Sequence, residues 1–166
     1  DASLVAIDPK TGQILAMVGS PDYFDKEIQG SVNVALRPRQ PGSSFKPIVY
    51  ATLFKGKWGP GYTLFDLETD FGGGYKPHNY DHKQYGPVTI RFALANSLNI
   101  SAVKALYLAG MNNVLQTAKE LGITTLTEPE RYGLSLVLGG GEVKLLELAG
   151  AYTAFAPVSY THLTLP

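Results

Sequence analysis

Pro47 is the residue that most constrains the fold of this chain. It lies in an apolar stretch that reads as a helix, and it limits where that helix can begin. Proline lacks a backbone N–H and is tolerated in an α-helix only in the first turn. If Pro47 is one of the first four helical residues, the helix begins no earlier than Ser44, and Ser43 lies at or near the N-cap. Ser43 and Lys46 are then three residues apart on one helix face, whereas Ser44 and Lys46 are two apart and diverge.

This serine–lysine spacing is suited to acyl transfer. A serine hydroxyl is a poor nucleophile until a base takes its proton, and a lysine is such a base once burial lowers its pKa. The N–H groups and the positive dipole end of a helix also stabilise an oxyanion on the attacked carbonyl. The pattern is weak on its own, however, since Ser-x-x-Lys arises by chance and serine is a common N-cap.

Composition limits the class of protein. The chain has 166 residues, the size of one domain, and its hydrophobic fraction of 45% is enough for a core. The 14 basic and 14 acidic residues give a formal net charge of +0, which argues against nucleic acid bound through bulk charge.

The absence of cysteine excludes disulfides, thiolate metal sites and a cysteine nucleophile. The sequence has no signal peptide and no apolar run that could span a bilayer, and it opens directly on a strand-like segment, so we expect an excised domain or a fragment.

The order of the expected elements, with strands first and helices after, predicts an α+β fold or a fragment of a mixed fold. Two β-prone runs, 3–7 and 13–18, flank the turn from Asp8 to Gly12 and predict a hairpin. The helix that contains Pro47 should end at Gly56. The other expected elements are a mostly irregular segment 19–42, a long structured loop 57–88 with one short strand, two helical pieces in 89–110 broken at 97–99, a helix capped by Asn112 or Asn113 that ends at Gly122, and a last helix after the glycines 139–141.

A second short motif, Ser97-Leu98-Asn99, lies at the expected helix break, 54 residues after Ser43. Alone it is no more than a polar helix junction. In this order, however, the two motifs match the first two parts of the signature of penicillin-interacting serine enzymes: Ser-x-x-Lys, Ser-x-Asn and a Lys-Thr-Gly strand.

The chain resembles the transpeptidase domain of class A, bifunctional penicillin-binding proteins over roughly residues 3–156. The resemblance rests on the stretches AIDPKTGQILAMVGS, RQPGSSFKPIVYA, PHNYDHKQYGPVTIRFALANSLNISAVK and LSLVLGGGEVKLLELAGAYTAFA. It implies the transpeptidase fold shared by penicillin-binding proteins and serine β-lactamases, an antiparallel sheet with helices. It also implies a D,D-transpeptidase that cross-links peptidoglycan stem peptides through a serine acyl-enzyme and is acylated by β-lactams.

The resemblance also implies a role for each motif residue. Ser43 would be the nucleophile, its backbone N–H would form half of the oxyanion hole, and Lys46 would be the base for acylation. Ser97 would relay a proton between the lysine and the departing amine. Asn99 would hydrogen-bond the substrate amide and hold the lysine. The expected substrate-binding positions are Gly42, at the entry to the helix, and Asn79 and Tyr80, in a loop lining the cleft.

The third motif does not follow. No Lys-Thr-Gly comes after Ser97, and the PKTG at 9–12 belongs to the first hairpin turn. We therefore expect residues 1–158 to be a partial transpeptidase domain whose later sheet strands are missing, and residues 159–166 to be a non-native tail. Because the missing strand would supply the second oxyanion N–H, we expect the fragment to be impaired or inactive alone.

Three other functions stay open. In a D,D-carboxypeptidase or β-lactamase-like hydrolase, water takes the acyl group. A non-catalytic penicillin-binding sensor or interaction domain would keep the fold alone, and a helical domain could carry Ser-x-x-Lys by chance. A variant with Ser43 replaced by alanine separates the last alternative from the others, because only a penicillin-interacting protein has β-lactam binding to lose.

The expected partners are stem peptides ending in D-Ala-D-Ala and β-lactams, with no nucleic acid and no cofactor. His78, Asp81 and His82 are close in sequence, but we expect no metal there, because metal ligands need a rigid geometry and further partners. By resemblance, the parent protein is anchored in the membrane, and this domain lies outside the cytoplasm, in the periplasm or at the outer face of the cytoplasmic membrane.

Overall fold

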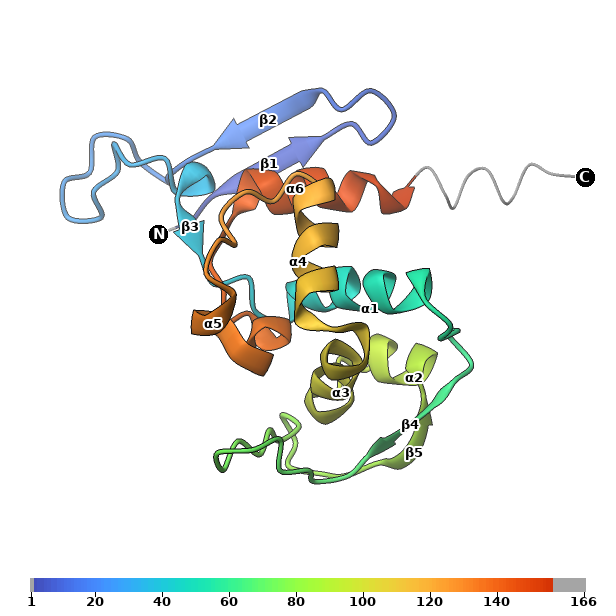
Figure 1. Ribbon diagram of the computed structural model, residues 1–166. Helices are drawn as coiled ribbons and strands as arrows, with labels where there is room; N and C mark the ends of the chain where they lie inside the picture. The colour runs from blue at the N-terminus through green and yellow to red at the C-terminus, as the bar shows by residue number, and fades with distance from the viewer. Residues whose placement is uncertain (1, 157–166) are drawn as a thin grey trace, which may run out of the picture. The chain divides into compact units, whose positions relative to one another are not determined.

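The helix that contains Pro47 begins at Lys46 in the computed structural model, which describes residues 2–156 (Figure 1). This helix, α1 (Lys46–Lys55), carries Pro47 in its first turn and ends at Gly56, as predicted. A 3₁₀ turn, η2 (Gly42–Phe45), precedes it, so the N-cap residue is Phe45 rather than Ser43. Ser43 therefore lies two residues before the N-cap, in a turn that leads directly into the helix.

The described residues divide into two compact units. The first unit comprises residues 2–40, 118–127 and 142–156, and the second comprises residues 41–117 and 128–141. The chain passes from the second unit to the first within α4 (Met111–Glu120).

The first unit contains an antiparallel hairpin. β1 (Leu4–Ile7) pairs with β2 (Ile14–Val18), which confirms the predicted hairpin. The Asp8 carboxylate closes the turn by accepting a hydrogen bond from the backbone N–H of Lys10 at 2.9 Å. α6 (Leu145–Thr153), the last predicted helix, packs along β1 (Figure 1).

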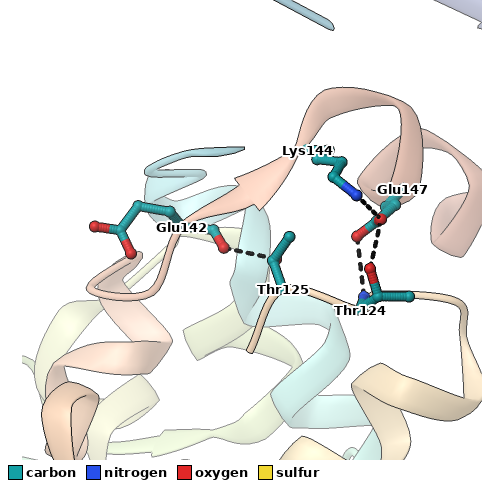
Figure 2. Close-up of polar contacts among 5 residues, drawn as sticks. All are labelled: Thr124, Thr125, Glu142, Lys144 and Glu147. Carbon is teal, nitrogen blue, oxygen red and sulfur yellow. Dashed lines mark hydrogen bonds and ion pairs between the residues drawn. The ribbon is translucent and has the colours of Figure 1, made fainter. Parts of the chain in front are cut away.

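A polar cluster ties the segment after α4 to the C-terminal part of the same unit (Figure 2). The Glu147 carboxylate accepts hydrogen bonds from the Thr124 N–H at 2.9 Å and hydroxyl at 2.8 Å, and it pairs with Lys144 Nζ at 2.8 Å. Thr125 donates to the carbonyl oxygen of Glu142 at 2.7 Å. Burial alone would raise the pKa of Glu147, but hydrogen bonds from Lys144 and Thr124 outweigh it and hold that pKa below its ordinary value. The charged carboxylate therefore anchors the segment.

Three short elements that the sequence did not predict complete this unit. β3 (Pro38–Arg39) pairs antiparallel with β6 (Val143–Lys144). A 3₁₀ turn, η1 (Val34–Leu36), begins at Asn33, whose side chain accepts a hydrogen bond from the Ala35 N–H.

Helices α1 and α3 pack together at the centre of the second unit. α2 (Ile90–Ala95) and α3 (Asn99–Ala109) are the two helical pieces expected in 89–110, and the break between them falls at 96–98. Thr89 caps α2 by accepting a hydrogen bond from the Phe92 N–H. Buried apolar side chains of α1 and α3 form the core, among them Ile48, Val49, Leu53, Ile100, Val103 and Leu106.

A pair of strands takes the place of the single strand expected in 57–88. β4 (Thr63–Asp66) pairs antiparallel with β5 (Gly86–Thr89). Alternate residues of β4 are buried, so Leu64 and Asp66 face inward. Strands of four residues within a segment rich in glycine, tyrosine and proline give too short a pattern to be predicted. The pairing brings the two ends of the loop 67–85 together.

The other differences concern short elements and helix boundaries. α4 begins at Met111, so Asn112 and Asn113 lie in its first turn and do not cap it. α5 (Pro129–Tyr132) and the 3₁₀ helix η3 (Gly133–Leu138) were not expected. The fold class is α+β with small antiparallel sheets, as predicted. The tail predicted to be non-native, 159–166, lies outside the described residues.

Candidate active site

Lys46 is buried at the start of α1 and is held by both polar residues of the second motif. The residue is 1% exposed. Its Nζ donates to the Ser97 carbonyl oxygen at 2.6 Å, to Ser97 Oγ at 3.1 Å and to Asn99 Oδ1 at 2.7 Å. Burial lowers the pKa of Lys46 from its ordinary 10.5 to about 8, which leaves roughly a tenth of the amine neutral at pH 7. Two motifs that are far apart in sequence therefore meet at one amine that can act as a base.

Ser43 is exposed in the turn before α1 and has an uncommitted hydroxyl. Its carbonyl oxygen accepts a hydrogen bond from the Lys46 N–H, and its hydroxyl has no partner among residues 2–156. The Ser44 hydroxyl, by contrast, donates to the carbonyl oxygen of Pro41 at 2.5 Å. The local hydrogen bonds thus leave Ser43, not Ser44, with an uncommitted hydroxyl one turn before Lys46.

The break between α2 and α3 holds Ser97 in a conformation that favours glycine. The Ser97 N–H donates to Leu94 O at 3.0 Å and the Leu98 N–H to Ala93 O at 2.9 Å, the pattern of a Schellman motif. Ser97 occupies the left-handed position of this motif, with φ of 53°. A side chain in such a conformation costs on the order of 1–3 kcal/mol, and strain of this kind concentrates at functional sites. Here it directs both oxygens of one serine at the Lys46 ammonium group.

The same turn explains why the middle residue of the second motif is apolar. Leu98 follows the left-handed residue, is 5% exposed and packs with Val88 and Ala93. A hydrophobic contact at this position commonly accompanies a Schellman motif. Leu98 is therefore turned inward, while Ser97 and Asn99 reach Lys46.

Asn79, a predicted substrate-binding residue, is buried and bonded within the chain. It is 4% exposed, and its Oδ1 accepts hydrogen bonds from the N–H groups of Asn99 at 2.7 Å and Ile100 at 3.3 Å. α3 has no capping side chain at its own N-cap, Leu98, so Asn79 supplies the cap from a distant loop. The Asn79 Nδ2 donates to Asp66 Oδ2 at 2.6 Å. The structure thus gives Asn79 a part in placing Asn99, and it adds Asp66, which the sequence analysis did not single out.

The residues on either side of Asn79 lie differently. The His78 carbonyl oxygen accepts a hydrogen bond from Asn99 Nδ2 at 2.9 Å. Both polar atoms of the Asn99 side chain are therefore committed within the chain, which favours its holding Lys46 over its binding a substrate amide. Tyr80 is 98% exposed and makes no hydrogen bond or ring contact within residues 2–156. The structure does not bring Tyr80 together with the other predicted residues.

Two glycines shape the turn that carries Ser43. Gly42 has φ of 59° and open space where a Cβ would lie, so the turn needs its backbone freedom rather than its small size. Gly139 supplies the close approach: a Cβ on it would lie 2.3 Å from Gly42 N and 2.5 Å from Gly42 Cα. From the sequence, the glycines 139–141 were predicted only as a turn. Gly139 is therefore an addition to the site, since it allows the end of η3 to pack on this turn.

His78 and His82, which are close in sequence, are also close in space. The ring centroids of His78 and His82 are 6.3 Å apart. Within residues 2–156, no group of three or more His, Asp or Glu side chains is placed to hold a metal ion. The chemistry available at the site is that of a hydroxyl, a partly neutral amine and a second hydroxyl bonded to that amine, which suits attack on a carbonyl followed by proton transfer.

Comparisons with known proteins point to one family. The family described as "Penicillin binding protein transpeptidase domain" matches residues 2–164. Penicillin-binding protein 1A of Aquifex aeolicus is 39% identical over 163 residues, which are 94% of this chain and 21% of that protein. Penicillin-binding protein 2D of Bacillus subtilis is 37% identical over 161 residues, which are 91% of this chain and 22% of that protein. This chain thus spans about a fifth of the length of these relatives.

Solved structures agree with the sequence comparisons. Penicillin-binding protein 1A from Haemophilus influenzae superposes with a TM-score of 0.79 at 29% identity, covering 92% of this chain and 23% of that one. PonA1 from Mycobacterium tuberculosis, in its complex with penicillin V, gives a TM-score of 0.80 at 26% identity, covering 93% of this chain and 43% of that one. Among the helices of residues 2–156, none combines the length and the apolar character needed to cross a bilayer.

Proposed function

Because this chain belongs to the family of penicillin-binding protein transpeptidase domains, of the class A type, we propose that Ser43 forms an acyl-enzyme with D-Ala-D-Ala stem peptides and with β-lactams. One observation carries the proposal. The buried Lys46, with its lowered pKa and its bond to Ser97 Oγ, lies one turn from the exposed Ser43 hydroxyl. A nucleophile, a base and a proton relay are the groups that serine acyl transfer needs.

The reaction that we propose has two halves: acylation of Ser43 with release of D-Ala, and transfer of the acyl group to an amine. Neutral Lys46 takes the Ser43 hydroxyl proton while Oγ forms a bond to the carbonyl carbon of the penultimate D-Ala. The carbonyl oxygen becomes an oxyanion, which the backbone N–H of Ser43 and the dipole of α1 stabilise. The C–N bond then breaks, and the proton passes from Lys46 through Ser97 Oγ to the leaving amine. The amine of a neighbouring stem peptide attacks the ester by the reverse route, which forms the cross-link and restores Ser43.

We propose that acylation of the 166-residue chain is slow. No Lys-Thr-Gly follows Ser97 in this sequence, and the PKTG at 9–12 lies in the β1–β2 turn. A missing oxyanion donor typically costs 10² to 10³ in rate. Slow acylation by a β-lactam can still be detected, because the ester product stays on the enzyme and accumulates until its mass can be measured.

The identity of the acceptor separates transpeptidase from hydrolase. The D,D-carboxypeptidase or β-lactamase-like alternative uses the same first half-reaction, and water instead of an amine then takes the acyl group. The non-catalytic sensor alternative is not favoured, since Ser43 has an uncommitted hydroxyl and Lys46 a lowered pKa. We also propose an extracytoplasmic location for this domain, because the proposed peptidoglycan substrate lies outside the cytoplasmic membrane.

Acylation by a penicillin tests the proposal directly. The purified chain is incubated with benzylpenicillin and its intact mass is measured, with Ser43→Ala and Ser44→Ala alongside. Ser44 is the matched control, because it is the adjacent exposed serine but its hydroxyl is already bonded to Pro41. We expect one adduct per chain on the wild type and on Ser44→Ala, and none on Ser43→Ala. An adduct that persists on Ser43→Ala, or a folded wild-type chain with no adduct, would contradict the proposal for this chain.

A further inference from the structure

Asp66 is a buried carboxylate that no step of the acyl transfer uses. It ends β4 and is 0% exposed, and its carboxylate accepts four hydrogen bonds within residues 2–156. Its Oδ2 accepts from Asn79 Nδ2 at 2.6 Å and from the Tyr85 N–H at 3.2 Å. Its Oδ1 accepts from the Ser101 hydroxyl at 2.8 Å and the Ser101 N–H at 3.1 Å. A buried charge is costly unless it is fully hydrogen-bonded, so this degree of satisfaction requires an explanation.

The partners of Asp66 gather at one place, the N-terminus of α3. The first N–H groups of a helix have no partner within the helix. In α3, Asn79 Oδ1 accepts those of Asn99 and Ile100, and Asp66 Oδ1 accepts that of Ser101. Asp66 also lies at the positive end of the helix dipole, where a negative charge is favourable. Asp66 and Asn79 together therefore form a two-residue cap for a helix that has none of its own.

The capped residue is the one that holds the base. Asn99 is the first residue of α3, and its Oδ1 accepts a hydrogen bond from Lys46 Nζ at 2.7 Å. The loop also holds its Nδ2, through the carbonyl oxygen of His78 at 2.9 Å. Asn99 thus has its backbone fixed by Asn79 and its side chain fixed between His78 and Lys46. An unbroken series of hydrogen bonds leads from Asp66 through Asn79 and Asn99 to Lys46.

We propose that Asp66 is a positioning residue for the catalytic base: it holds Asn79, which caps α3 and keeps Asn99 against Lys46 Nζ. Its importance for catalysis rests on the proposed function, whereas the contacts themselves need no substrate. The role follows from the way Lys46 is made basic. Burial is the cause of its lowered pKa, and Asn99 and Ser97 are the residues that bond its Nζ. Loosening Asn99 admits water to the ammonium group and returns the pKa of Lys46 toward its ordinary value.

Asp66→Asn is the variant that tests this role. An asparagine has nearly the same shape, but its NH₂ group cannot accept the two hydrogen bonds that one carboxylate oxygen accepts now. Either Asn79 or Ser101 then loses its partner, and the cap of α3 is broken. Asp70→Asn is the matched control, because Asp70 is an exposed carboxylate in the loop after β4, and within residues 2–156 its Oδ1 accepts only from the Gly72 N–H.

The readout is the titration of the Lys46 side chain in the free protein. Carbon-13-labelled lysine gives a Cε signal for each lysine, and the signal that disappears in Lys46→Met is that of Lys46. We expect the pKa of Lys46 in Asp70→Asn to equal that of the wild type, and in folded Asp66→Asn to be higher by at least one unit. Each unit lowers the neutral fraction of the amine at pH 7 about tenfold, so penicillin acylation should fall by the same factor. A merely structural role would lower stability without moving the pKa of Lys46 in the folded state.

An unchanged or lower pKa of Lys46 in folded Asp66→Asn overturns the inference. If Asp66→Asn does not fold, Asn79→Ala is measured instead, because it leaves Asp66 bonded to Ser101 and Tyr85 and carries the same expectation. If the wild type is not acylated by penicillin, the proposed function fails, while the titration still decides whether Asp66 positions Lys46.

Discussion

Replacement of Lys46 by methionine should raise the free energy of unfolding at neutral pH and remove part of its dependence on pH. The folded chain releases the Lys46 proton at about pH 8, whereas the unfolded chain holds it to 10.5. Between these values the unfolded state binds more protons, so stability rises with pH. Below pH 8 both states keep the proton, and the cost of burying the charge is felt in full.

The two pKa values of Lys46, about 8 and 10.5, set the size of this effect. At pH 6 the burial cost is about 3 kcal/mol, and at pH 9.5 about half of it remains, so the free energy of unfolding should rise by about 2 kcal/mol over this range. Methionine has a similar length and no charge. It leaves the Ser97 and Asn99 oxygens without the ammonium donor, but water can reach the exposed Ser97. We therefore expect a net stabilisation of about 1–3 kcal/mol at pH 6.

Urea unfolding followed by the fluorescence of Trp58, at pH 6 and pH 9.5, measures both quantities. Burial raises the pKa of Tyr50, which lowers stability at still higher pH, but this contribution cancels in the difference between wild type and Lys46→Met. The control is Lys55→Met, which removes an exposed lysine from the same helix and should keep the rise in stability between pH 6 and 9.5, because Lys46 is intact. If the wild type and Lys46→Met run parallel from pH 6 to 9.5, Lys46 does not carry a burial cost and the reasoning is refuted.

Two further substitutions test other contacts, one in each unit. Gly139→Ala should slow acylation of the chain by penicillin about tenfold or more, because its Cβ would press on Gly42 N at 2.3 Å. Gly59→Ala is the control, because its Cβ meets nothing within 4 Å, and it should match the wild type. Time-resolved mass measurements follow the acylation of both variants. Glu147→Gln should lower the free energy of unfolding at pH 7 by about 1–2 kcal/mol, because Lys144 loses a charged acceptor. Since the pKa of Glu147 is held below its ordinary 4.5, this difference should fade in urea unfolding as the pH falls through the lowered pKa, and a difference that persists in acid would contradict the assigned cause.

The features predicted correctly from the sequence are those with a local cause. The missing N–H of Pro47 limits the start of α1, and a turn with glycine joins β1 to β2. The break at Ser97 was visible because two helical patterns meet there. Even here the boundary shifted, since a 3₁₀ turn took up the residues before Lys46 and moved the N-cap from Ser43 to Phe45.

The features that were missed depend on contacts between distant residues. Asn79 was predicted only as a substrate-binding residue, because nothing in its sequence neighbourhood reveals that it caps a helix 20 residues later. Asp66 gave no signal, because its partners lie in the loop and in α3, up to 35 residues away. Gly139 looked like an ordinary turn residue, and its close approach to Gly42 exists only in the folded chain. Sequence spacing identifies the reacting groups, but the residues that hold them are identified only by their contacts.

Two features of the candidate site lower the stability of the folded chain, so other contacts must compensate for them. Lys46 costs about 3 kcal/mol at neutral pH because its charge is buried, and Ser97 costs on the order of 1–3 kcal/mol because of its left-handed backbone. Lys46→Met or Ser97→Gly would relieve one of these costs, but each also removes a group that the proposed proton transfers use. Since a stable domain has only about 5–15 kcal/mol in total, both costs must be offset nearby. The capping of α3 by Asp66 and Asn79 provides such an offset, because it satisfies the helix N-terminus and at the same time holds Asn99 on the base.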